Sequence, residues 1–159
     1  MISSSLPLFS ESFWNYKIKT ETTYVTSATA VNINELAVPL PNDGGATGWY
    51  LIIGYFGLGC SSTTNAARMG MAASSIGDSS NIIEVPDTAT SIVHNYEGTS
   101  YSGPTWPSNN VNNFYFGKQI YMAKASSTTT GRLTPTLQVS SSGANITASM
   151  GPSIIFWKR

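Results

Sequence analysis

Apolar and polar residues alternate with a period of two along much of this chain. In residues 14–19, asparagine and lysine alternate with larger apolar side chains, which predicts a strand with Trp14, Tyr16 and Ile18 turned toward the core. Further segments of this kind are separated by turn-forming residues at a spacing of roughly 8 to 12 residues. No amphipathic helix longer than two turns fits the sequence. The pattern therefore predicts an all-β fold.

Three segments are more strongly apolar than the others: 49–59, 114–125 and 153–157. The first is apolar at both alternating sets of positions, which predicts a central strand covered on both faces. It is too short for a membrane-spanning helix, which needs roughly 20 apolar residues. We expect the three segments to form the core, with Trp14 or Trp157 lying against the glycines of the first one.

The number and spacing of these strands favour one architecture. Eight to ten short strands with no repeat of fixed period predict a jelly-roll-like antiparallel β-sandwich, with a barrel as the alternative, formed as a single domain by residues 14–159. Residues 1–13 keep neither helical nor strand periodicity, so we interpret them as an extended N-terminal arm. The arm either docks in a groove, which can belong to another subunit, or remains a frayed tail. Its apolar interface residues are Ile2, Leu6, Leu8, Phe9 and Phe13.

The longest segment without a strand pattern is 98–113, which we predict to be an ordered loop. Aromatic and amide side chains alternate in and beside it, and flat apolar faces next to amides suit sugars or a protein partner. The alternative is that the tryptophan in this loop closes the end of the sandwich or a seam between subunits. The candidate loop residues are Tyr96, Tyr101, Trp106, Asn109 and Asn110.

Composition excludes several classes of partner. Eight basic and eight acidic residues cancel, only 10% of residues are charged, and serine plus threonine fill roughly a quarter of the chain. Scattered lysines make no phosphate-binding surface, so we expect no nucleic acid. A weakly charged, hydroxyl-rich surface suits proteins in assemblies or outside cells. The N-terminus lacks the features of a signal peptide, and no segment predicts a membrane span.

Catalytic and metal-binding patterns are also missing from the sequence. There is no nucleophile elbow, and the sole cysteine and sole histidine, Cys60 and His94, are more simply a small core residue and a core or interface histidine. A dyad between them stays open at this stage. The carboxylates are scattered, and EF-hand, Walker and dinucleotide patterns are absent. We therefore expect no enzyme activity, no cofactor and no metal.

The chain resembles the small all-β virion proteins of tailed phages, namely capsid decoration (cement) proteins and head-fibre or receptor-binding tips. The resemblance lies in the apolar arm at 1–13, the jelly-roll pattern rich in serine, threonine, asparagine and glycine, and the aromatic terminal segment 154–157. It implies a homotrimer that binds the major capsid protein or another virion protein, assembled in the host cytoplasm and located on the virion. A carbohydrate- or receptor-binding module is the alternative function.

Overall fold

The computed structural model describes residues 14–41, 49–62, 67–74, 76–86, 92–94, 100–106, 111–112, 114–125, 130–139 and 146–159, with the backbone alone for those between 76 and 106 and for 115 and 125. The interface residues expected in the arm, Ile2, Leu6, Leu8, Phe9 and Phe13, lie outside this part, as do Tyr96, Asn109 and Asn110 of the expected loop. The described elements are twelve strands and one short 3-10 turn: β1 (Asn15–Lys19), β2 (Thr23–Val25), β3 (Val31–Asn32), η1 (Asn34–Leu36), β4 (Val38–Leu40), β5 (Trp49–Cys60), β6 (Ala67–Ser74), β7 (Ile76–Pro86), β8 (Ile92–His94), β9 (Ser100–Trp106), β10 (Tyr115–Ala125), β11 (Gly131–Val139) and β12 (Ala148–Lys158).

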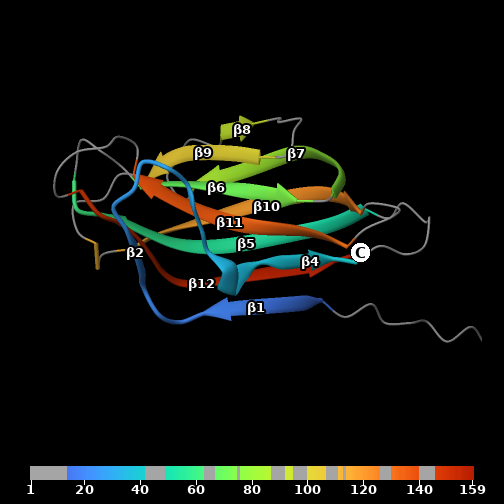
Figure 1. Ribbon diagram of the computed structural model, residues 1–159, viewed down its shortest axis with the longest axis horizontal. Helices are drawn as coiled ribbons and strands as arrows, with labels where there is room; N and C mark the ends of the chain where they lie inside the picture. Colours follow the sequence, from blue (N-terminus) through green and yellow to red (C-terminus); the bar gives the residue numbers. More distant parts are fainter. Residues whose placement is uncertain are drawn as a thin grey trace, which may run out of the picture.

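The strands form a β-sandwich of two antiparallel sheets that face each other (Figure 1). The larger sheet has the order β1-β12-β5-β10-β7-β8, with β2 also paired to β12. The smaller sheet has the order β3-β11-β6-β9, with β4 also paired to β11. The predicted all-β sandwich is therefore confirmed.

The connectivity is that of a jelly roll. If β3 and β4 are counted as one strand, because both pair with β11, and β2, β7 and β8 are left out of the count, the first, eighth, third and sixth strands lie side by side as β1-β12-β5-β10. The second, seventh, fourth and fifth lie side by side in the smaller sheet as β3/β4-β11-β6-β9. This order results from two interlocked Greek keys. Strands β7 and β8 extend the larger sheet beyond this framework, at its upper edge in Figure 1.

The three strongly apolar segments lie next to one another at the centre of the larger sheet. Strand β5 pairs with β12 on one side, through Ile155 opposite Gly54, and with β10 on the other side, through Gln119 opposite the same glycine. β-Branched and aromatic residues fill all three strands, which suits a pleated surface packed against a second sheet. The sequence correctly identified the central strands.

The core lies between the two sheets. Its largest fully buried members come from both layers, with Phe56 and Ile155 from the larger sheet and Met69 and Leu137 from the smaller one. Leu36 of η1 is also fully buried and belongs to the same cluster. A buried polar pair lies among them: the Tyr121 hydroxyl donates a hydrogen bond to the Gln119 side-chain oxygen, so the phenol is satisfied inside the sandwich.

The glycine of the central strand has a different neighbour from the one expected. A Cβ atom added at Gly54 would collide with the ring of Phe56, two residues along the same strand, and not with Trp14 or Trp157. Residues i and i+2 of a strand share a face, and the aromatic ring lies over the bare backbone between them. The expectation that Trp14 or Trp157 fills this space was wrong, because the ring comes from the strand itself.

The expected loop at 98–113 is in part a strand. Tyr101 and Trp106 lie in β9, where they pair with Met71 and Ala67 of β6, so the prediction of a loop was wrong at these positions. Glycine and proline at 103 and 104 concealed the strand. Strand β9 ends the path of the smaller sheet, and its register shifts between the residues that pair with Arg68 and Gly70. Edge strands and bulges tolerate proline.

Candidate functional site

The outward-facing side of the larger sheet is the most unusual surface in the described part of the chain. The strand register aligns its side chains in rows across β1, β12, β5 and β10. One row runs from Tyr16 through Phe156 and Ile53 to Ile120. The surface is lined by Trp14, Tyr16, Ile18, Trp49, Leu51, Ile53, Tyr55, Phe116, Ile120, Met122, Ile154 and Phe156, and we call it the outer face.

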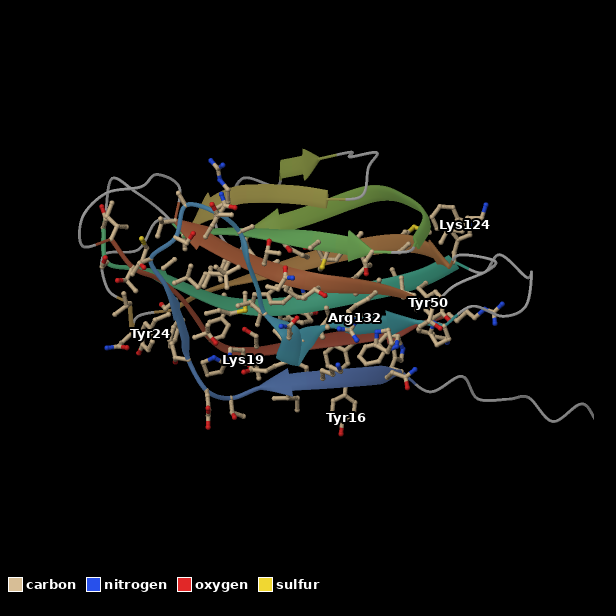
Figure 2. All side chains as sticks on the ribbon, in the orientation of Figure 1. Tyr16, Lys19, Tyr24, Tyr50, Lys124 and Arg132 are labelled. Atoms are coloured by element: carbon tan, nitrogen blue, oxygen red, sulfur yellow. The ribbon has the colours of Figure 1, made fainter. Side chains whose placement is uncertain are left out.

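Large apolar side chains of the outer face are open to solvent. Tyr16 is 61% exposed, Ile18 55% and Phe116 49%. Figure 2 shows Tyr16 pointing away from the body of the sandwich. Eight of the large hydrophobic residues that are exposed in the described part belong to this face: Trp14, Tyr16, Ile18, Trp49, Leu51, Tyr55, Phe116 and Met122. A contiguous apolar patch of this kind marks an interaction surface in a soluble protein.

Strand β1 shows that the polarity of this edge is inverted. Its apolar residues face outward, whereas Lys19 is buried, with 3% of its surface exposed. The Lys19 ammonium forms an ion pair with Glu35 of η1, and the Lys17 ammonium donates a hydrogen bond of 2.6 Å to the Ala37 carbonyl. The prediction that Trp14, Tyr16 and Ile18 face the core was wrong, because Glu35 of η1 and the carbonyl of Ala37, which follows η1, offer oxygen acceptors to lysines on the inner side.

Strand β5 differs from its prediction in a related way. We expected cover on both faces, but Trp49 is 40% exposed and Tyr55 42%. The alternate set of positions, which includes Tyr50 and Ile52, is buried against the smaller sheet. Apolar residues at both sets of positions predicted two buried faces, and the sandwich buries one of them. The second face would be buried only if something outside the described part of this chain covered it.

A shallow depression lies within the outer face. It is lined by Trp14, Ile53, Tyr55 and Phe156, with a volume of about 290 Å³. Nearby, the rings of Tyr16 and Phe156 lie with centroids 6.3 Å apart and planes tilted by 46°. The lining is almost wholly apolar, so the depression suits an aromatic or aliphatic side chain better than a charged ligand.

Among the described side chains, the charged ones on the outer face are lysines. Lys118 lies opposite Tyr55 in the register of β5 and β10, and Lys158 lies opposite Leu51. Lys124 stands near the end of β10, and Figure 2 shows it at one end of the sandwich. Lys118 and Lys158 therefore place positive charge on the apolar surface, which favours a partner with carboxylates or no charge.

Tyr50, a core residue of β5, has a phenol whose pKa departs from its ordinary value. Burial raises the pKa of the Tyr50 phenol above its ordinary value, because the phenolate would lose hydration inside the sandwich. The Tyr50 hydroxyl lies 3.4 Å from the Pro41 carbonyl oxygen, to which it donates a hydrogen bond. This phenol is a buried structural group of β5 and faces away from the outer face.

The residues considered for catalysis do not come together. Cys60 is fully buried in β5, and His94 lies in β8, with β10 and β7 between the two strands. Three strand spacings alone separate β5 from β8 by about 14 Å. The register adds a further offset along the strands, because His94 lies level with the part of β5 around Ile53 and not with Cys60, so the two residues are too far apart for a catalytic dyad. Within the described residues, no group of three or more histidine, cysteine, aspartate or glutamate side chains could hold a metal ion. No helix in that part is long and apolar enough to cross a membrane.

Sequence reasoning missed the residues that make the outer face. Tyr16, Leu51 and Tyr55 were assigned to the core, because alternation alone does not say which side of a strand is inward. The signal that could have identified this face was the double apolar pattern of β5, combined with the lack of enough other apolar segments to cover it. Tyr101 and Trp106 belong to β9 of the other sheet and take no part in it.

Comparisons with known proteins identify no family. No protein-family model matches the chain, and no curated protein matches its sequence. A structural match links it to the crystal structure of the infectious bursal disease virus VP2 subviral particle, at 8% sequence identity and a TM-score of 0.26. The match covers 94% of this chain, which spans 41% of the VP2 chain. At this TM-score the likeness carries no functional argument.

Proposed function

We propose that this chain is a non-enzymatic structural protein of a virion, a capsid decoration protein that binds and stabilises the capsid surface as a homo-oligomer. The observation that carries the proposal is the exposed apolar outer face. A protein working alone in water gains nothing from placing Tyr16 and Ile18 outside and Lys19 inside. A subunit of an assembly does gain, because the outer face is then buried between proteins.

Two further features support a role in a virus particle. The jelly roll is a fold that viral capsid and lectin domains share, and this support is by analogy of fold. The low charge and the hydroxyl-rich composition suit a surface that works outside the cell after assembly inside it. The partners would be further copies of the chain and the major capsid protein, with no cofactor, nucleic acid or membrane involved.

Co-sedimentation with capsids tests this proposal. The purified chain would be mixed with capsids assembled from the major capsid protein of the virus whose genome encodes the chain, and the pellets would be quantified. We expect saturable binding at a fixed number of copies per capsid, together with greater resistance of the capsids to heat. Absence of the chain from the pellet at micromolar concentration would contradict the proposal.

A carbohydrate-binding module is the second candidate, favoured by the aromatic side chains around the depression. Trp14 and Tyr55 could stack on the apolar face of a sugar ring. In that case Tyr55→Ala would abolish binding on a glycan array while leaving the unfolding transition in place. The same array with Trp106→Ala tests the loop-side site expected from the sequence. No glycan bound by the wild-type chain would leave the structural role as the better account.

A further inference from the structure

The outer face is too large and too apolar to remain in water, and the chain itself contains a segment that fits it. We infer that residues 1–13 of a second copy of this chain lie across the outer face and seat an apolar side chain in its depression. This inference rests on the proposed function, because it names what fills the assembly surface. It makes the N-terminal segment the link between copies.

The size of the surface is that of a stable interface. The exposed surface areas of its eight large hydrophobic residues add up to nearly the area that each partner buries in a standard protein interface, which is about 800 Å². The depression lined by Ile53, Tyr55 and Phe156, with its volume of about 290 Å³, has room for one aromatic side chain. Aromatic anchors in such central depressions dominate the energy of interfaces.

The chemistry of the N-terminal segment matches the surface. Residues 1–13 contain one acidic residue, Glu11, no lysine and no arginine, together with large apolar residues that include Ile2, Leu6, Leu8, Phe9 and Phe13. The outer face combines apolar rows with Lys118 and Lys158. Two outer faces pressed together would instead oppose lysines with lysines, so charge favours the segment over a face-to-face dimer.

The point where the segment joins the sheet favours an exchange between copies. Trp14 precedes β1 at the edge of the larger sheet and already lines the depression of its own copy. To cross the same face, the chain would have to reverse direction just before Trp14, and the only residues between 8 and 13 that commonly form turns are Ser10 and Ser12. A segment that continues the direction of β1 without such a reversal would extend toward a neighbouring copy.

The segment is long enough for this exchange. Thirteen extended residues span up to about 43 Å, whereas the width from β1 to β10 is about 14 Å, three strand spacings. Residues near Trp14 can therefore bridge the gap between two copies while the first nine residues cross the neighbouring outer face. Leu8 and Phe9 lie at the position along the segment where such a crossing would begin.

Engineered cysteines test both the site and the exchange. A Phe9→Cys chain and a Tyr55→Cys chain are co-expressed, oxidised and separated without reductant; parallel pairs use Leu6→Cys and Leu8→Cys so that the register need not be known. The native Cys60 is fully buried, so it does not compete. We expect disulfide-linked dimers that contain one chain of each kind. Val31→Cys, an exposed apolar position in the smaller sheet, replaces Tyr55→Cys in the control and should give none.

A single chain carrying both substitutions separates exchange from self-docking. Phe9→Cys with Tyr55→Cys in one chain should form covalent oligomers. A bridge closed within one chain would overturn the inference in favour of self-docking. Cross-linking at Tyr55→Cys no greater than at Val31→Cys, from all three N-terminal positions, would overturn the site as well.

Failure of this inference can be told apart from failure of the proposed function. If the chain sediments with capsids but its N-terminal cysteines never reach Tyr55→Cys of another copy, the function holds and the inference fails. If the cross-links form and no capsid is bound, the copies exchange their N-terminal segments in an assembly that is not a decorated capsid.

Discussion

At the scale of single residues, the closest contact in the central strand is the one between Gly54 and the ring of Phe56. Gly54→Val should lower the free energy of unfolding by about 1 to 3 kcal/mol, because the new side chain forces the ring out of the core. Chemical denaturation measures this effect. Ile53→Val, at the neighbouring half-buried position, serves as the control and should cost less than Gly54→Val. An unchanged midpoint for Gly54→Val would show that Phe56 has room to move.

The ion pair of Lys19 is the next residue-scale feature that can be tested. Glu35→Gln leaves a buried ammonium without its carboxylate and should destabilise the chain by about 1 to 3 kcal/mol. Lys19→Met, which removes the charge along with the need for a partner, should cost less. Equal loss for both variants, measured by denaturation at pH 7, would contradict this account of the buried lysine.

The phenol of Tyr50 makes a prediction about alkaline pH. Its folded pKa is raised by burial, so the unfolded chain ionises first as the pH passes about 10. The stability present below that pH is therefore lost as the pH rises through the folded pKa. Tyr50→Phe should flatten the fall in unfolding free energy between pH 9 and about 11. A slope identical to that of the wild type would mean that other groups cause the loss of unfolding free energy at alkaline pH.

At the scale of elements, β1 is the strand whose orientation the sequence did not predict. Ile18→Thr replaces an exposed apolar side chain on an edge strand with a smaller, polar one. It should change the free energy of unfolding by less than about 0.5 kcal/mol. Leu58→Ala, in the buried set of β5, should cost about 2 to 5 kcal/mol. Thermal unfolding of a dilute sample compares the two. A large loss from Ile18→Thr would place that residue in the core.

Periodicity was sufficient to predict most of the segments that become strands and to identify the three that lie at the centre of the larger sheet. The segments around β5, β10 and β12 stood out because β-branched and aromatic residues fill them, and these three strands are neighbours in the sheet. Periodicity could not predict which face of β1 is inward, since that depends on the acceptors Glu35 and Ala37 of a distant segment. Nor could it reveal β9, where a bulge and an edge position tolerate proline.

At the scale of the whole molecule, the jelly roll leaves one sheet face uncovered, and that face determines how copies associate. Tyr55→Glu would place a carboxylate opposite Lys118, so the strand gains a cross-strand ion pair while the outer face loses its apolar centre. Val31→Glu makes the same kind of change on the smaller sheet and serves as the matched control. Only the first should disturb assembly.

The most direct test of the outer face as an assembly surface is the mass of the chain in solution, measured by sedimentation equilibrium at micromolar concentration. We predict a homotrimer, three times the 17.0 kDa chain mass, for the wild type and for Val31→Glu, and a 17.0 kDa species for Tyr55→Glu with its unfolding transition intact. A wild-type chain that sediments only as a 17.0 kDa species would contradict the account.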